Sequence, residues 1–91
     1  MCRNIRTLFN FEPPATEREI REASLQFVRK LSGMNAPSQA NQAVFDDAVA
    51  EVARAASRLI AHLTTNAVPK DRAVEAAKAK ARAALRYATA E

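Results

Sequence analysis

The sequence predicts an all-α fold, a small three-helix bundle with an ordered N-terminal arm, and three features of the chain predict this class. Helix-favouring residues dominate, with 21 alanines, whereas glycine occurs once, at Gly33. The four prolines, at positions 13, 14, 37 and 69, divide the chain into segments of helical length. A chain of 91 residues suffices for one hydrophobic core but not for two. We therefore expect a single helical domain over residues 1–91.

The first helix is predicted over residues 17–31, after an arm of residues 1–15. Thr16 stands at the N-cap position and Glu19 follows three residues later, which is the spacing of a capping box. Gly33 supplies a left-handed exit after the last turn. Leu25 faces away from the expected buried stripe, and the arm offers Ile5, Leu8, Phe9 and Phe11 as its partners. The buried stripe of this helix is predicted to consist of Ile20, Ala23, Ser24, Phe27 and Leu31.

The second helix is predicted over residues 39–63, after Pro37, and has the most regular apolar pattern. Its apolar positions alternate at intervals of four and three residues, which is typical of an antiparallel bundle inside one chain. An intermolecular coiled coil is the alternative, which we consider the less common outcome of such a pattern. The seam consists of Phe45, Val49, Val52, Ala56, Leu59 and Leu63.

The third helix is predicted over residues 71–88, with Asp71 as its N-cap. Its buried stripe is rich in alanine, so that it removes little apolar surface from water, and we expect this helix to be the least firmly docked. We accordingly expect Phe27→Ala and Leu59→Ala to destabilise the protein more than Leu85→Ala does. The stripe consists of Val74, Ala77, Ala81, Ala84, Leu85 and Ala88.

Motifs that build active sites are scarce in this sequence. It contains no glycine-rich phosphate loop, no G-x-S-x-G, no H-E-x-x-H and no paired Cys or His at metal spacing. The only histidine, His62, is a weak candidate for a general base, because a histidine near a helix C-terminus is also favoured by the helix dipole. We expect no cofactor and no metal site, and a non-enzymatic role is favoured.

Basic residues are concentrated near the two ends of the chain, which carries a net charge of +4. Lys78, Arg82 and Arg86 recur every four residues and form one ridge along the third helix. Such a ridge suits nucleic-acid phosphates, although a solvated helix face is the commoner explanation. The candidate nucleic-acid-binding residues are Arg3, Arg6, Arg72, Lys78, Arg82 and Arg86.

Cys2 is the only cysteine and raises a third alternative. If Met1 were removed, Cys2 would carry both an α-amine and a thiol beside Arg3, and basic neighbours favour the thiolate. Such a terminus could act as a nucleophile or chelate a metal. The structural alternative, a small half-buried residue that begins the arm, is the one we favour.

The opening stretch, MCRNIRTLFNFEPPAT, and its continuation, EIREASLQFVRKLSG, resemble a family of short, uncharacterised bacterial proteins, domain of unknown function 2277. The resemblance extends to the segment KDRAVEAAKAKARA and so covers nearly the whole chain. It implies a bacterial, cytoplasmic protein whose residues 1–16 belong to the domain. It implies no activity, cofactor, partner or site residue.

Together these patterns predict a small cytoplasmic protein-interaction module, with a homo-oligomer as one form of it. One cysteine cannot form an internal disulfide, and the sequence shows neither a signal peptide nor an apolar run of membrane-spanning length. We therefore expect protein partners or self-association and no membrane. Nucleic-acid binding by the basic ridge and a site at Cys2 are the alternatives.

Overall fold

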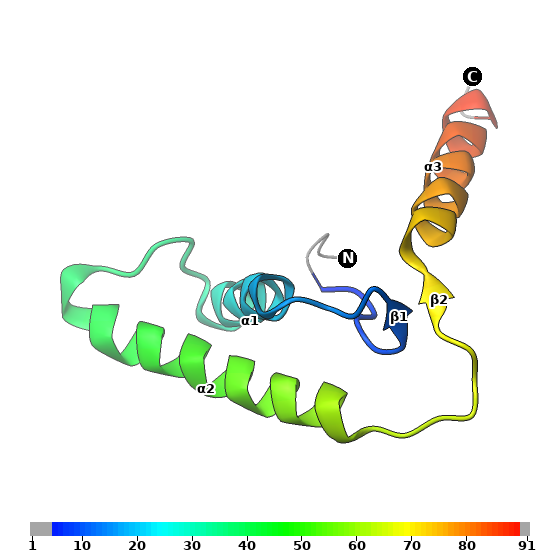
Figure 1. The fold of residues 1–91 in the computed structure, drawn as a ribbon. Helices are drawn as coiled ribbons and strands as arrows, with labels where there is room; N and C mark the ends of the chain where they lie inside the picture. Colours follow the sequence, from blue (N-terminus) through cyan, green and yellow to red (C-terminus); the bar gives the residue numbers. More distant parts are fainter. Residues whose placement is uncertain (1–4, 90–91) are drawn as a thin grey trace. The chain divides into compact units, whose positions relative to one another are not determined.

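The computed structural model describes residues 5–89, and for residues 87–89 it describes the backbone only. Three helices dominate: α1 (Glu17–Ser32), α2 (Gln42–His62) and α3 (Arg72–Thr89), as Figure 1 shows. A short 3-10 turn (Gln39–Asn41) precedes α2, and two strands of two residues each, β1 (Phe11–Glu12) and β2 (Lys70–Asp71), complete the elements. The predicted mostly helical class and the three helices are confirmed, with helix ends that differ by up to three residues.

The described chain divides into two compact units. The first unit contains residues 5–9 and 15–65 and therefore includes α1 and α2. The second contains residues 10–14 and 66–89 and therefore includes β1, β2 and α3. Packing of helix on helix is described for α1 against α2, whereas α3 contacts β2. The packing of all three helices into one bundle stays a prediction.

Local capping rules explain where α1 begins and ends. The Glu19 backbone amide donates to Thr16 Oγ1 at 3.1 Å, and the Thr16 amide donates to Glu19 Oε1 at 3.0 Å, which confirms the predicted capping box. Glu19 also accepts from Arg6 of the arm at 3.1 Å. At the other end Gly33, with φ of 73°, donates its amide to the Arg29 carbonyl.

Thr16→Ala is expected to lower the free energy of unfolding by about 1 kcal/mol, because it leaves an amide of the first turn of α1 without its side-chain acceptor. Urea unfolding followed by circular dichroism measures this loss. Thr7→Ala is the matched control, since Thr7 is exposed in the arm, and it is expected to change stability by less than about 0.5 kcal/mol. Equal effects of the two substitutions would show that the capping box contributes nothing.

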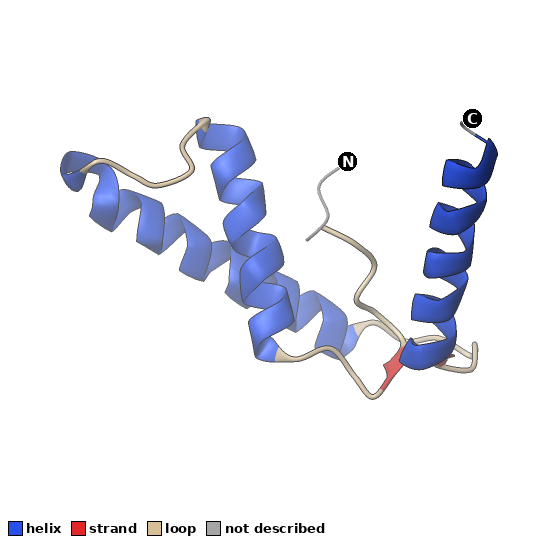
Figure 2. Ribbon diagram, turned by 90° about the horizontal axis from the view of Figure 1, so that it is seen from above, coloured by secondary structure: helices blue, strands red, loops and turns tan. Residues whose placement is uncertain are grey.

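The core of the first unit lies where α1 crosses α2, a crossing that Figure 2 shows. Val28, Phe45 and Val49 form a buried cluster. Ile20 and Ser24 are also buried, and the Ser24 hydroxyl donates to the Ile20 carbonyl at 2.8 Å. The half-buried side chains that surround the cluster are Leu25, Ala48 and Val52. Leu25 thus packs into the α1–α2 core, and not away from it as the sequence suggested.

The predicted stripe of α1 is wrong at two positions, because Phe27 is 43% exposed and Leu31 is 72% exposed. The buried row instead follows a spacing of four residues, from Ile20 through Ser24 to Val28. Rows spaced by four on two helices interdigitate at an inclined crossing, so contact is confined to the crossing and the helix ends diverge. The same geometry leaves Leu59 (59% exposed) and Leu63 (44%) of the predicted second seam uncovered, while Phe45 and Val49 are buried as predicted.

The second unit joins the end of the arm to the segment before α3. β1 and β2 pair in parallel, with Phe11 opposite Lys70 and Glu12 opposite Asp71. Asn10, with φ of 65°, accepts from the Lys70 amide at 2.8 Å through its carbonyl. Asp71 then caps α3, since its Oδ1 accepts from the Val74 amide at 3.0 Å. The pairing orders this part of the predicted arm.

Candidate functional site

An open groove between α1 and α2 brings several positive side chains together in the first unit. Its volume is about 770 Å3. Its apolar floor contains buried Ile20 from α1 and half-buried Ala50 and Ala53 from α2. The polar lining residues are Glu17, Arg18, Arg21, Arg54, Ser57 and Arg58. We call this surface the arginine groove.

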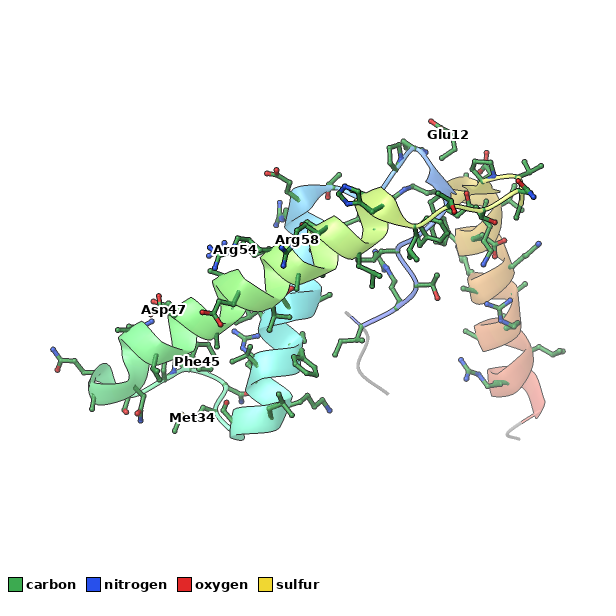
Figure 3. All side chains as sticks on the ribbon, turned by 90° about the horizontal axis from the view of Figure 1, so that it is seen from below. Glu12, Met34, Phe45, Asp47, Arg54 and Arg58 are labelled. Carbon is green, nitrogen blue, oxygen red and sulfur yellow. The ribbon has the colours of Figure 1, made fainter. Side chains whose placement is uncertain are left out.

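Helical spacing brings four arginines to one groove. Arg18 and Arg21 are three residues apart on α1, and Arg54 and Arg58 are four apart on α2, so each pair lies on one side of its helix. Figure 3 shows Arg54 and Arg58 on the same side of α2 where it passes α1. Small alanines on α2 leave room between the helices for the groove. The two arginine spacings are present in the sequence, but the sequence does not show that the two helices face each other.

The charge of the arginine groove is not balanced by the residues that line it. Four arginines and one glutamate line it, which gives a formal charge of +3. Arg18 forms an ion pair with Glu22, with 3.1 Å between Nε and Oε1. Among residues 5–89, no carboxylate lies within ion-pair distance of Arg21, Arg54 or Arg58. The groove is therefore suited to an anion.

A second groove between α1 and α2 shares Arg18 and Arg21 with the arginine groove and has a balanced charge. It encloses about 420 Å3, and Leu25 and Val49 form its apolar part. Its charged lining residues are Arg18, Arg21, Glu22 and Asp46. Two positive and two negative side chains leave this second groove without net charge, so Arg18 and Arg21 face carboxylates on this side.

The predicted general base, His62, lies at the last turn of α2. Its Nδ1 is 2.8 Å from the Arg58 carbonyl oxygen, and the side chain is exposed. This contact belongs to the helix end, four residues back along the same helix. A histidine is favoured near the negative end of a helix dipole, and the role of His62 as a general base stays a prediction.

The predicted basic residues are distributed over both units. Arg6 is in the first unit and binds Glu19. In the second unit Arg72 donates to the Pro13 carbonyl oxygen and lies 5.9 Å from the centre of the Phe11 ring. Arg6 and Arg72 thus make contacts within the protein, and their part in nucleic-acid binding stays a prediction.

The ridge of α3 is exposed as predicted at Lys78, Arg82 and Arg86. Lys78 lies 3.7 Å from the Glu75 carboxylate. Cys2 and Arg3 lie outside the described residues, so both the thiol site and the arm's contribution to a basic surface stay predictions.

No helix within residues 5–89 has the length and apolar character needed to cross a membrane. In the same part of the chain, no group of three or more His, Cys, Asp or Glu side chains is placed to hold a metal ion.

Comparison with known families identifies the chain as a member of one of them. The family described as an uncharacterized conserved protein (DUF2277) matches residues 1–78, and the chain belongs to it, as the opening motif indicated. The match includes the arginine groove and ends at Lys78, the first residue of the basic ridge. No curated protein and no solved structure matches the chain.

Proposed function

We propose that this member of the DUF2277 family is a small helical binding module that pairs with a second copy of itself through α2. The observation that supports this proposal most directly is that the C-terminal half of the apolar seam of α2 is exposed. Phe45 and Val49 of this seam are buried by α1, whereas Leu59 and Leu63 are exposed. We call half-buried Ala56 and exposed Leu59 and Leu63, which follow the core residue Val52, the uncovered seam.

The small size of the core supports this proposal. Among residues 5–86, no large side chain is less than 2% exposed, and the buried apolar residues are Ile20, Val28, Phe45 and Val49. Small domains with a limited core add cross-links, bound metals or oligomerisation. A single cysteine cannot form an internal disulfide, and an identical chain is a partner that is present wherever the protein is made. The lone cysteine also supports a reducing, cytoplasmic location for the module.

The spacing of the uncovered seam fits an antiparallel pair of helices. Its positions are spaced by three and four residues, as in coiled coils, and the small Ala56 allows the two helices to approach closely. In a two-fold symmetric pair each patch meets its own copy, so Ala56 of one chain would lie near Leu63 of the other. Burying two leucines per chain contributes about 1.5–3 kcal/mol for each side chain that becomes fully buried.

The oligomeric mass tests the proposal. Light scattering after size-exclusion chromatography is expected to give about twice the 10.0 kDa chain mass at micromolar concentration. Leu59→Glu is expected to give a monomer with unchanged helix content, because a carboxylate in the seam cannot be buried without a partner. Leu85→Glu is the matched control on α3, where the side chain is 67% exposed, and it should stay dimeric. A monomeric wild-type protein, or a dimer that survives Leu59→Glu, would overturn the proposal.

Nucleic-acid binding through α3 is the second candidate function, and the exposure of Lys78, Arg82 and Arg86 on one ridge favours it. The expected result is that Arg82→Glu with Arg86→Glu abolishes retardation of single-stranded DNA or RNA at low salt. Affinity should also fall by roughly one power of salt concentration per phosphate contact. Absence of retardation by the wild-type protein at low salt removes this candidate.

A further inference from the structure

The arginine groove concentrates positive charge in a way that the fold does not require. Arg54 and Arg58 are like charges four residues apart on α2, which destabilises a helix by about as much as an opposite pair stabilises it. Their guanidinium groups, and that of Arg21, have no carboxylate partner within residues 5–89. In the second groove Glu22 and Asp46 balance Arg18 and Arg21, but neither carboxylate lines the part of the arginine groove that Arg54 and Arg58 form. Uncompensated charge that breaks a local rule is typical of functional sites.

The lining of the arginine groove indicates a ligand with two parts. Guanidinium groups present a fork of N–H donors that matches the oxygens of a phosphate. Ile20, Ala50 and Ala53 form an apolar floor beneath them, and Ser57 adds a hydroxyl that can donate or accept. A volume of about 770 Å3 lies within the range of small-molecule sites. Phosphate recognition and apolar contact are thus offered side by side.

We propose that the arginine groove binds a small phosphorylated organic molecule. Arg21, Arg54 and Arg58 would bind the phosphate, and the organic part would lie on Ile20, Ala50 and Ala53. A compact ligand is favoured over a nucleic-acid strand because the arginines come from two facing helices and line one groove. A nucleic-acid strand would instead bind along a line of positive charges such as the ridge of α3.

The proposal is independent of self-association. Arg54 and Arg58 each lie two residues from Ala56, which at about 100° per residue places them about 160° from it around α2, and Arg58 lies about 100° from Leu59. Substitution of these arginines should therefore leave the oligomeric mass unchanged. Loss of the dimer and loss of the ligand can be observed separately.

Titration with adenosine monophosphate, followed by amide chemical shifts in nitrogen-15 labelled protein, tests the site. The expected result is a set of shifts confined to residues 17–21 and 50–58. The double variant Arg54→Gln with Arg58→Gln is expected to weaken binding about tenfold or more, because each guanidinium supplies charge-assisted hydrogen bonds. Arg82→Gln is the matched control, an exposed arginine on α3, and it should change the affinity less than about twofold. The conservative pair Arg54→Lys with Arg58→Lys should bind with intermediate affinity, since charge is kept but the fork is lost.

Further ligands separate the parts of the proposal. Inorganic phosphate is expected to bind the same amides more weakly than the nucleotide, and adenosine without phosphate more weakly still. If inorganic phosphate binds with the affinity of the nucleotide, the apolar floor contributes nothing to binding. If adenosine binds with the affinity of the nucleotide, the arginines contribute nothing. Absence of shifts at about 10 mM nucleotide, or equal losses in the glutamine double variant and in Arg82→Gln, would overturn the proposal. So would displacement of the nucleotide from these amides by a twelve-residue oligothymidylate at lower concentration, which would assign the groove to nucleic acid.

Discussion

Phe45→Ala is expected to lower the free energy of unfolding of the first unit by about 3–5 kcal/mol. Phe45 is 7% exposed and forms the buried cluster with Val28 and Val49, so truncation removes the largest side chain of that cluster. Loss of its ring leaves a cavity at the α1–α2 crossing, which two helices joined by one loop can close only by losing other contacts. Such a loss is a large part of the stability of so small a domain. Urea or thermal unfolding followed by circular dichroism measures it.

Phe27→Ala is the matched control, with the same chemistry on α1. Its side chain is 43% exposed, so the expected loss is about 1 kcal/mol or less. The sequence pattern alone predicted a loss of roughly 2–5 kcal/mol for this substitution, because it placed Phe27 in the core. Equal losses for Phe27→Ala and Phe45→Ala would contradict the described packing and restore the stripe that the sequence suggested.

The ends of α1 could be predicted from the sequence because their signals are local. Thr16, Glu19 and Gly33 act on backbone groups within three or four residues, so no knowledge of the tertiary structure is needed to place them. The start of α2 is less well defined because it lacks such a local signal. Asn41 makes no side-chain cap to the helix, and α2 is instead preceded by the 3-10 turn that ends at Asn41.

The buried face of α1 could not be predicted because two apolar rows overlap on this helix. One row follows Ile20, Phe27 and Leu31, and the other follows Ile20, Ser24 and Val28. A serine in the second row hides it from a hydrophobicity pattern, although its hydroxyl is satisfied inside the helix by the Ile20 carbonyl. The choice between the rows depends on how steeply α2 crosses, which is a property of the pair and not of α1.

The parallel pairing of β1 with β2 was missed for a related reason. Two-residue strands carry no alternating pattern, and Phe11 and Lys70 are far apart in the sequence. The arginine groove could be predicted only in part. The spacings of Arg18, Arg21, Arg54 and Arg58 are visible in the sequence, but the ridge of α3 is the more regular charge pattern and therefore the stronger signal. A charge pattern in the sequence can be assigned to a groove only when the helix that faces it is known.

Val28→Asp is expected to be the most destabilising single substitution in the first unit, lowering the free energy of unfolding by about 3–5 kcal/mol or more. Val28 is 7% exposed and belongs to a hydrophobic cluster with Phe45 and Val49, against which Leu25, Ala48 and Val52 pack. A carboxylate there loses most of its hydration. The first unit should therefore unfold, with a large loss of the helical signal in circular dichroism. Val44→Asp is the matched control, since Val44 is 69% exposed on α2, and its expected effect is below about 0.5 kcal/mol.

The pH dependence of the same variant identifies the buried charge as the cause. Burial raises the pKa of the introduced carboxyl in the folded state above its unfolded value of about 3.9, because desolvation disfavours the charged form. The folded state then binds the proton more tightly than the unfolded state, so the penalty is present at neutral pH and shrinks as the pH falls through the raised pKa. Val28→Asn has nearly the same shape and no titration, and the stability gap between it and Val28→Asp should therefore narrow from pH 7 towards pH 4. A gap that stays constant over this interval would show that lost packing, and not the charge, accounts for the effect, and that water reaches position 28.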